Sequence, residues 1–227
     1  MELEQQKMKN QTVVSILLNS LLAALGLFTF GIGVYLSIQA NIGVGPWDTF
    51  YLGINKATGI QYGTISVISS FIIIGVDLLM KEKIGIGMLL DAVIVGKTVD
   101  LMNWLDLVPA QQNPIAGLFM LLAAMIIMGF SIYLYMSAGL CCGPRDTLVV
   151  AFGRRLPKVP IGLISSGIML IVFVFGWLLD GPIGLGTVIL VCLQGPIMQA
   201  AFNIMKFNPT EVDHQNLIQS IKVICGK

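Results

Sequence analysis

The chain has 227 residues, of which 56% are hydrophobic and 11% charged, and its formal net charge at pH 7 is +1. A soluble domain carries about 25% charged residues, so this composition excludes an ordinary water-soluble protein and indicates an all-α, polytopic membrane helix bundle. The balanced charge gives no sign of a nucleic-acid partner, and we expect none.

Cysteine and histidine residues are too few to suggest a metal site or a catalytic site. Cys141, Cys142, Cys192 and Cys225 show no CxxC spacing, and the single histidine is His214, near the end of the chain. We therefore expect no metal site and no cofactor. No nucleophile–base pair is visible either, which predicts no catalytic residues and a protein that is not an enzyme.

The first apolar segment, over residues 13–40, follows a polar N-terminal segment over residues 1–12. The apolar run is longer than the core of a signal peptide, which has about 7–15 residues, and it lacks a clear small-residue cleavage site. We interpret it as a retained membrane span that follows a cytoplasmic segment.

Gly45, Pro46, Trp47 and Asp48 come next, in the motif Gly-Pro-x-Asp-Thr. Proline is favoured at the first helical position and an acidic residue in the first turn, so the motif predicts a helix over 46–58. Two interpretations stay open: an ordinary helix start, or a short re-entrant helix whose N-terminus faces a polar or anionic solute. We assign Trp47 to the outer aromatic belt.

The predicted spans 62–80 and 84–104 differ in charge, because the latter carries Asp91, Lys97 and Asp100. Ionisable groups in hydrocarbon are costly and normally face the bundle interior or water. Lys97 and Asp100 are three residues apart and share a helix face, whereas Asp91 points elsewhere. One interpretation is a structural ion pair plus an interhelical hydrogen bond. The other is a coupling-ion or proton site, with Asp91 as first candidate.

The second half begins with a predicted span over 114–138, followed by Gly143, Pro144 and Asp146 in a second Gly-Pro-x-Asp-Thr motif. This motif predicts a short helix over 144–156. Two further spans follow, over 160–179 and 183–206. A basic patch with an expected role at the inner lipid headgroups comprises Arg145, Arg154, Arg155 and Lys158.

An internal duplication links the two halves. Residues 31–50 align with 129–148 at a shift of 98, with 8 identities in 20 positions, and Ile-Gly-x-Gly recurs at 84–87 and 183–186. Gly-x-Gly at these places indicates close helix packing. We predict two three-span repeats, 13–107 and 108–206. Because each repeat has an odd number of spans, the second repeat enters the membrane from the opposite side. The two repeats are therefore inverted, as they are in many secondary transporters. The charges of the third span have no charged counterparts: Leu190, Pro196 and Gln199 replace them.

Charge placement predicts the orientation. With both termini in the cytoplasm, 11 of the 13 Lys and Arg residues lie inside, Lys56 alone lies outside and Lys97 falls within a span. This bias follows the positive-inside rule and predicts six spans. The tail over 207–227 is either an amphipathic surface helix or a disordered cytoplasmic segment.

At the Gly-Pro-x-Asp-Thr and Ile-Gly-x-Gly motifs, the sequence resembles the YczE/YyaS/YitT group of bacterial integral membrane proteins, over about residues 13–206. It is most similar to the YczE-like branch, and the run 43–48 carries much of the likeness. The resemblance implies a shared fold and a bacterial plasma-membrane location, without an established substrate. A threonine typical of the group directly after Ile-Gly-x-Gly is present as Thr187 but replaced by Met88 in the first copy.

Two functions stay open at this stage. The first is a small secondary transporter or permease that contacts membrane lipid and moves a small polar or anionic solute with a coupling ion. The second is a non-transporting accessory membrane protein that supports a biosynthetic or secretion complex. A homodimer is compatible with either. The expected solute or ion path comprises Asp48, Asp91, Lys97, Asp100, Asp146 and Gln199.

Overall fold

The computed structural model describes residues 13–82, 84–140 and 143–207. Within these residues the chain forms eight helices and no strand. The predicted N-terminal segment 1–12, and all of the predicted tail 207–227 except Phe207, lie outside the described residues.

Six of the helices are long and two are short. Each predicted apolar segment forms one long helix whose ends differ from the prediction by at most two residues. The two Gly-Pro motifs begin the short helices. The long helices are α2 (Val13–Gln39), α4 (Tyr62–Leu79), α5 (Ile86–Leu105), α6 (Pro114–Ser137), α8 (Ile161–Leu178) and α9 (Leu185–Ile204), and the short ones are α3 (Pro46–Thr58) and α7 (Pro144–Arg155).

Four of the described helices, α2, α4, α6 and α9, are long and apolar enough to cross a membrane. Helix α8 adds a shorter apolar stretch over Gly162–Leu178, and α5 is the long helix that carries Asp91, Lys97 and Asp100. Large apolar side chains also cover much of the outer surface, as on α2 and α8, where a water-soluble bundle would be polar.

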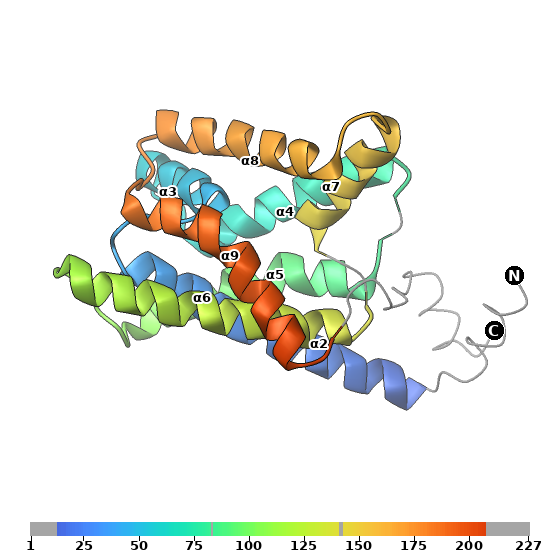
Figure 1. Ribbon diagram of the computed structural model, residues 1–227, viewed down its shortest axis with the longest axis horizontal. Helices are drawn as coiled ribbons and strands as arrows, with labels where there is room; N and C mark the ends of the chain where they lie inside the picture. Colours follow the sequence, from blue (N-terminus) through green and yellow to red (C-terminus); the bar gives the residue numbers. More distant parts are fainter. Residues whose placement is uncertain (1–12, 83, 141–142, 208–227) are drawn as a thin grey trace, which may run out of the picture.

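The helices form two groups with α9 crossing between them (Figure 1). Helix α2 packs along α5 and α6, while α8 lies over α3 and α7 packs against α4. Helix α9 packs on α6 but makes little contact with α8, although their counterparts in the first half, α4 and α5, pack closely. The second half is therefore more open than the first.

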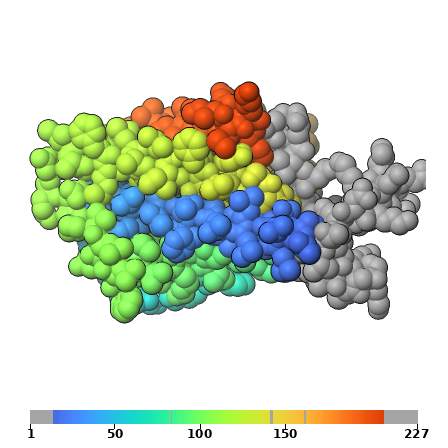
Figure 2. Space-filling model, turned by 90° about the horizontal axis from the view of Figure 1, so that it is seen from below, coloured from blue at the N-terminus to red at the C-terminus, as the bar shows by residue number. Residues whose placement is uncertain are grey.

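A small residue allows close contact between α2 and α6. A Cβ added to Gly26 would lie 2.7 Å from the backbone nitrogen of Tyr135, so no larger residue fits there without a shift of α6. Figure 2 shows α2 lying directly beside α6 along the same face of the molecule. The contact brings the first long helix of each predicted repeat together.

Equivalent positions of the two predicted repeats make equivalent contacts. The Gly186 amide at the start of α9 donates a hydrogen bond to the carbonyl of Ile42, with a distance of 2.7 Å. The Gly87 amide at the start of α5 donates to the carbonyl of Leu140, with a distance of 2.9 Å. Each Ile-Gly-x-Gly motif thus binds the segment that precedes the short helix of the other half.

A second pair of contacts joins the ends of the short helices to the other half. Lys56, near the end of α3, forms an ion pair with Asp180, which follows α8. Arg154, at the end of α7 and 98 residues after Lys56, forms an ion pair with Glu82, which follows α4, at 2.8 Å. Both short helices are therefore held against the half to which they do not belong.

Candidate functional site

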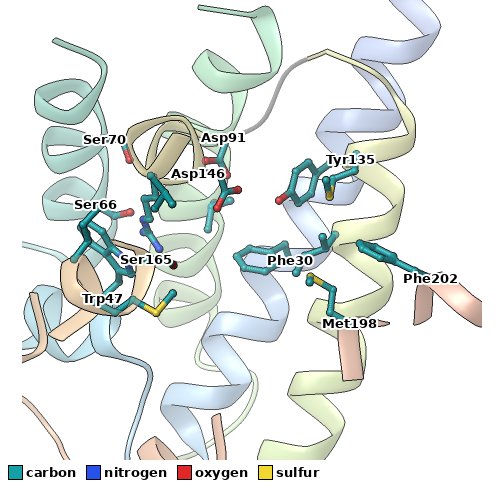
Figure 3. Close-up of a pocket in the computed structure, with 18 residues that line it drawn as sticks. Phe30, Trp47, Ser66, Ser70, Asp91, Tyr135, Asp146, Ser165, Met198 and Phe202 are labelled. Atoms are coloured by element: carbon teal, nitrogen blue, oxygen red, sulfur yellow. The ribbon is translucent and has the colours of Figure 1, made fainter. Parts of the chain in front are cut away.

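The candidate site is a cavity of about 500 Å³ enclosed by helices from both halves. This volume lies in the range of small-molecule sites, which is about 300–1,000 Å³. Figure 3 shows the labelled serines and aspartates, together with Trp47, on one side, and Phe30, Tyr135, Met198 and Phe202 on the other. The polar lining residues are Ser66, Ser70, Asp91, Arg145, Asp146 and Ser165.

Arg145 is held in the interior by aromatic residues of α3. Its guanidinium donates a hydrogen bond to the Tyr51 hydroxyl at 3.0 Å. The guanidinium carbon lies 4.8 Å from the ring centroid of Trp47 and 5.3 Å from that of Tyr51. These distances are typical of cation–π contacts. The first turns of α3 and α7, which come from different halves, therefore meet at this arginine.

The assignments of Arg145 to the headgroups and of Trp47 to the outer aromatic belt were both wrong. Both side chains line the cavity, because the two short helices pack across the halves and bring their first turns together. Of the other members of the predicted basic patch, Arg154 and Arg155 pair with Glu82 instead of standing free.

Three carboxylates surround this arginine. Asp48, Asp91 and Asp146 all lie close enough to Arg145 to interact with its charge. Asp48 also accepts a hydrogen bond from the Tyr62 hydroxyl, with a distance of 2.7 Å. Asp48 thus ties α3 to the start of α4.

Asp91 and Asp146 lie beside the same glycine. A Cβ added to Gly143 would lie 2.6 Å from an Asp91 carboxylate oxygen and 4.0 Å from an Asp146 oxygen. A larger residue at Gly143 would therefore displace the Asp91 carboxylate. The close approach places one acidic residue from α5 and one from α7 at the same wall of the cavity.

Both Gly-Pro motifs form helix starts of the same kind. Gly45 and Gly143 are the residues before the first turn, with Pro46 and Pro144 at the first position. The hydroxyl of the motif threonine donates to the carbonyl of the motif glycine in both cases, at 3.0 Å for Thr49 and 3.1 Å for Thr147.

The remaining residues of the expected path lie elsewhere. The Lys97 ammonium and an Asp100 carboxylate oxygen are 3.2 Å apart. The other Asp100 oxygen accepts a hydrogen bond from the Gly63 amide at 2.7 Å, at the start of α4. Gln199 donates to the Asn203 side chain at 3.0 Å on the exposed face of α9. None of these three expected path residues lines the cavity.

Two residues beside the cavity, bonded to Arg145 and Asp48, carried no strong sequence signal. Tyr51 and Tyr62 lie in partly apolar segments and read as ordinary packing residues until Arg145 and Asp48 are placed beside them. Ser66 and Ser165 are the exception: after one inserted residue the repeat continues at a shift of 99, as for the Ile-Gly-x-Gly motifs, and this shift pairs the two serines. Both line the cavity. Repetition of a polar residue inside two apolar segments was therefore a usable signal.

Comparison with known proteins places the chain among membrane proteins without assigned activities. The model of the "Family of unknown function (DUF6198)" matches residues 17–203. The "Uncharacterized membrane protein YczE" of Bacillus subtilis (strain 168) is 29% identical over 77% of this chain and 80% of its own length. The "Uncharacterized protein YyaS" of the same organism is 26% identical over 80% of this chain and 91% of its own.

A third relative comes from another organism. An "Uncharacterized protein" of Haemophilus influenzae (strain ATCC 51907 / DSM 11121 / KW20 / Rd) is 28% identical over 77% of this chain and 79% of its own length. No solved structure matches the chain significantly. The resemblance to the YczE-like group that the motifs indicated is confirmed by these relatives.

Proposed function

The chain belongs to the family of unknown function DUF6198, and from that premise we propose that it is a small secondary transporter of the bacterial plasma membrane. The observation that carries the proposal is the cavity, which holds an arginine and two carboxylates within an otherwise apolar bundle. Charged groups at membrane depth are costly, and they are typical of solute and ion pathways.

The proposal includes six spans arranged as two inverted three-span repeats. Its support is that aligned residues of the two halves, Trp47 with Arg145 and Ser66 with Ser165, line one cavity. The paired contacts of Gly186 and Gly87 add to this support. Related halves that meet at a shared site are the basis of alternating access in many transporters.

In the proposed orientation both termini lie in the cytoplasm, as the positive charges indicate. A single cysteine placed at Thr58, the end of α3, should react with a membrane-impermeant maleimide on intact cells. A cysteine at Lys158, just after α7, should react only after permeabilisation. The sequence contains four native cysteines, so the assay uses a variant in which all four are replaced by serine. Labelling in the reverse pattern would contradict the orientation.

Transport is tested with purified protein in proteoliposomes, with a library of small labelled solutes and with imposed proton or sodium gradients. Asp91→Asn and Asp146→Asn should each reduce gradient-driven uptake, because both carboxylates face the cavity. Asp106→Asn is the matched control, because Asp106 is an exposed carboxylate beyond the end of α5. Full uptake in both cavity variants, or no uptake of any solute, would contradict the proposal.

A further inference from the structure

We infer that the cavity binds an organic cation that carries an apolar group, an inference that rests on the proposed transport function and names its class of substrate. Three features of the cavity support this class of substrate: the charges that meet in it, the position of two carboxylates, and the apolar, aromatic character of the wall opposite them.

Among the residues that the structure describes, acidic groups outnumber basic ones around the cavity. Asp48, Asp91 and Asp146 interact with one arginine, Arg145. That arginine is already bonded to Tyr51 and stacked on aromatic rings. Carboxylates that lack a counter-charge are strongly unfavourable within a low-dielectric bundle. A cationic ligand would supply the missing positive charge.

Two of the carboxylates are placed to receive such a ligand. Asp91 and Asp146 lie beside Gly143 and both line the cavity. Asp48 is instead engaged by the Tyr62 hydroxyl at the start of α4. The pair formed by Asp91 and Asp146 is therefore the part of the acidic group that faces open volume.

The opposite wall is apolar and aromatic. Phe30, Met198 and Phe202 face the polar side across the cavity (Figure 3). Aromatic faces attract cations, and methionine adapts to apolar groups of varied shape. Residues of both α8 and α9, such as Met169 and Met198, line the cavity, and these two helices make little contact with each other. An apolar substituent would lie against this wall while the charged group meets the carboxylates.

An anionic solute fits these features less well, although the helix starts alone favoured one. The first turns of α3 and α7 carry their own carboxylates, Asp48 and Asp146. These acidic groups complement the positive ends of the helix dipoles. An anion would therefore meet two carboxylates at the places where it needs donors, and Arg145 is already held by Tyr51.

The test is equilibrium dialysis of radiolabelled probes against the full chain in lipid nanodiscs, with empty nanodiscs as the blank. The probes share a benzyl group and differ in charge: benzyltrimethylammonium, benzyl alcohol and phenylacetate. The quaternary ammonium keeps its charge at every pH, so binding reports on the protein alone. We expect saturable binding of the cation and weaker binding of the other two.

Variants show whether the carboxylates are responsible. Asp91→Asn and Asp146→Asn should each weaken cation binding by about tenfold or more. Asp146→Glu, which keeps the charge, should lose less binding than Asp146→Asn, and the control Asp106→Asn should bind as the unaltered chain does. Size-exclusion profiles and thermal unfolding identify any variant that fails to fold. If the neutral variants fail to fold, Asp146→Glu still allows a comparison at the same residue.

Three results would overturn the inference. They are tighter binding of phenylacetate, cation binding that is unchanged in both neutral variants, and no saturable cation binding up to about 10 mM. Dialysis measures binding without transport, so this outcome is separate from that of the uptake assay. Cation binding without uptake of any solute would contradict the transporter proposal alone, and uptake of anions alone would contradict only the substrate class.

Discussion

Replacement of Arg145 by glutamine should be among the most destabilising single changes in the chain. The change removes a charged hydrogen bond to Tyr51, a type of bond worth about 1.5–3 kcal/mol. It also removes the stacking on Trp47 and Tyr51, which contributes about 0.5–2 kcal/mol. The three carboxylates nearby would then have no counter-charge.

These losses overlap, so they do not add. Removal of one partner from a buried ionic group costs about 3–5 kcal/mol, and we expect Arg145→Gln to lower the free energy of unfolding by that amount. Arg145→Lys should fall in between, because lysine keeps the charge but lacks the planar group that stacks and donates to Tyr51.

The measurement is equilibrium unfolding in mixed detergent micelles, followed by far-ultraviolet circular dichroism. Arg154→Gln is the matched control, because the Arg154 side chain is 65% exposed and its ion pair with Glu82 lies at the end of α7. The Glu82 side chain is only 6% exposed, but Arg155 lies 3.8 Å from it and keeps a positive charge there, so this control should change the free energy of unfolding little. In the double variant Arg145→Gln with Asp48→Asn, part of the lost stability should return.

Equal losses for the Arg145 and Arg154 variants would refute the placement of Arg145 at the centre of a charged group. A double variant that is less stable than Arg145→Gln would also count against it, because removal of an uncompensated carboxylate should relieve repulsion.

Three other predictions are tested by the same unfolding assay. Asp100→Ala removes the acceptor for the amide at the start of α4 and should lower the free energy of unfolding by about 1–3 kcal/mol. Lys97→Ala, at a half-exposed side chain, should lower it by less than about 1 kcal/mol. Equal losses for the two variants would contradict a capping role for Asp100. Gly186→Ala should cost about 1–3 kcal/mol, because the added Cβ would lie 2.6 Å from a backbone oxygen; an unchanged unfolding curve would show that α9 shifts freely. Asp77→Leu should stabilise the protein, because the Asp77 carboxylate is fully buried and neither oxygen has a hydrogen-bond partner among the described residues. A loss of stability would indicate a partner such as a bound cation.

Asp100 and Asp91 show how far a charged residue in an apolar segment can be interpreted from sequence. The three-residue spacing of Lys97 and Asp100 predicted an ion pair, and the structure has one at 3.2 Å. The separate direction of Asp91 followed from helical periodicity. That Asp91 faces Gly143 while Asp100 caps α4 did not follow, because both contacts join segments that lie far apart along the chain.

The sequence by itself determined the helices of this protein. Apolar runs of about 20 residues form helices wherever backbone groups must be satisfied in lipid, and Gly-Pro pairs begin helices through local geometry. Both signals depend only on neighbouring residues, so the predicted ends agree with the observed helices to within two residues. The internal repeat was also visible, since aligned residues recur at a shift of 98 and, after one inserted residue, at a shift of 99.

The tertiary structure alone decided which side chains share the cavity. Arg145 and Trp47 were assigned to the membrane surface because each lies at a predicted helix start, next to a loop that was expected to be exposed. They meet instead, with 4.8 Å between the guanidinium carbon and the ring centroid. The reason is that α3 packs against α8, and α7 against α4. Such cross-packing depends on the shapes of helix surfaces from both halves, and no local pattern contains that information.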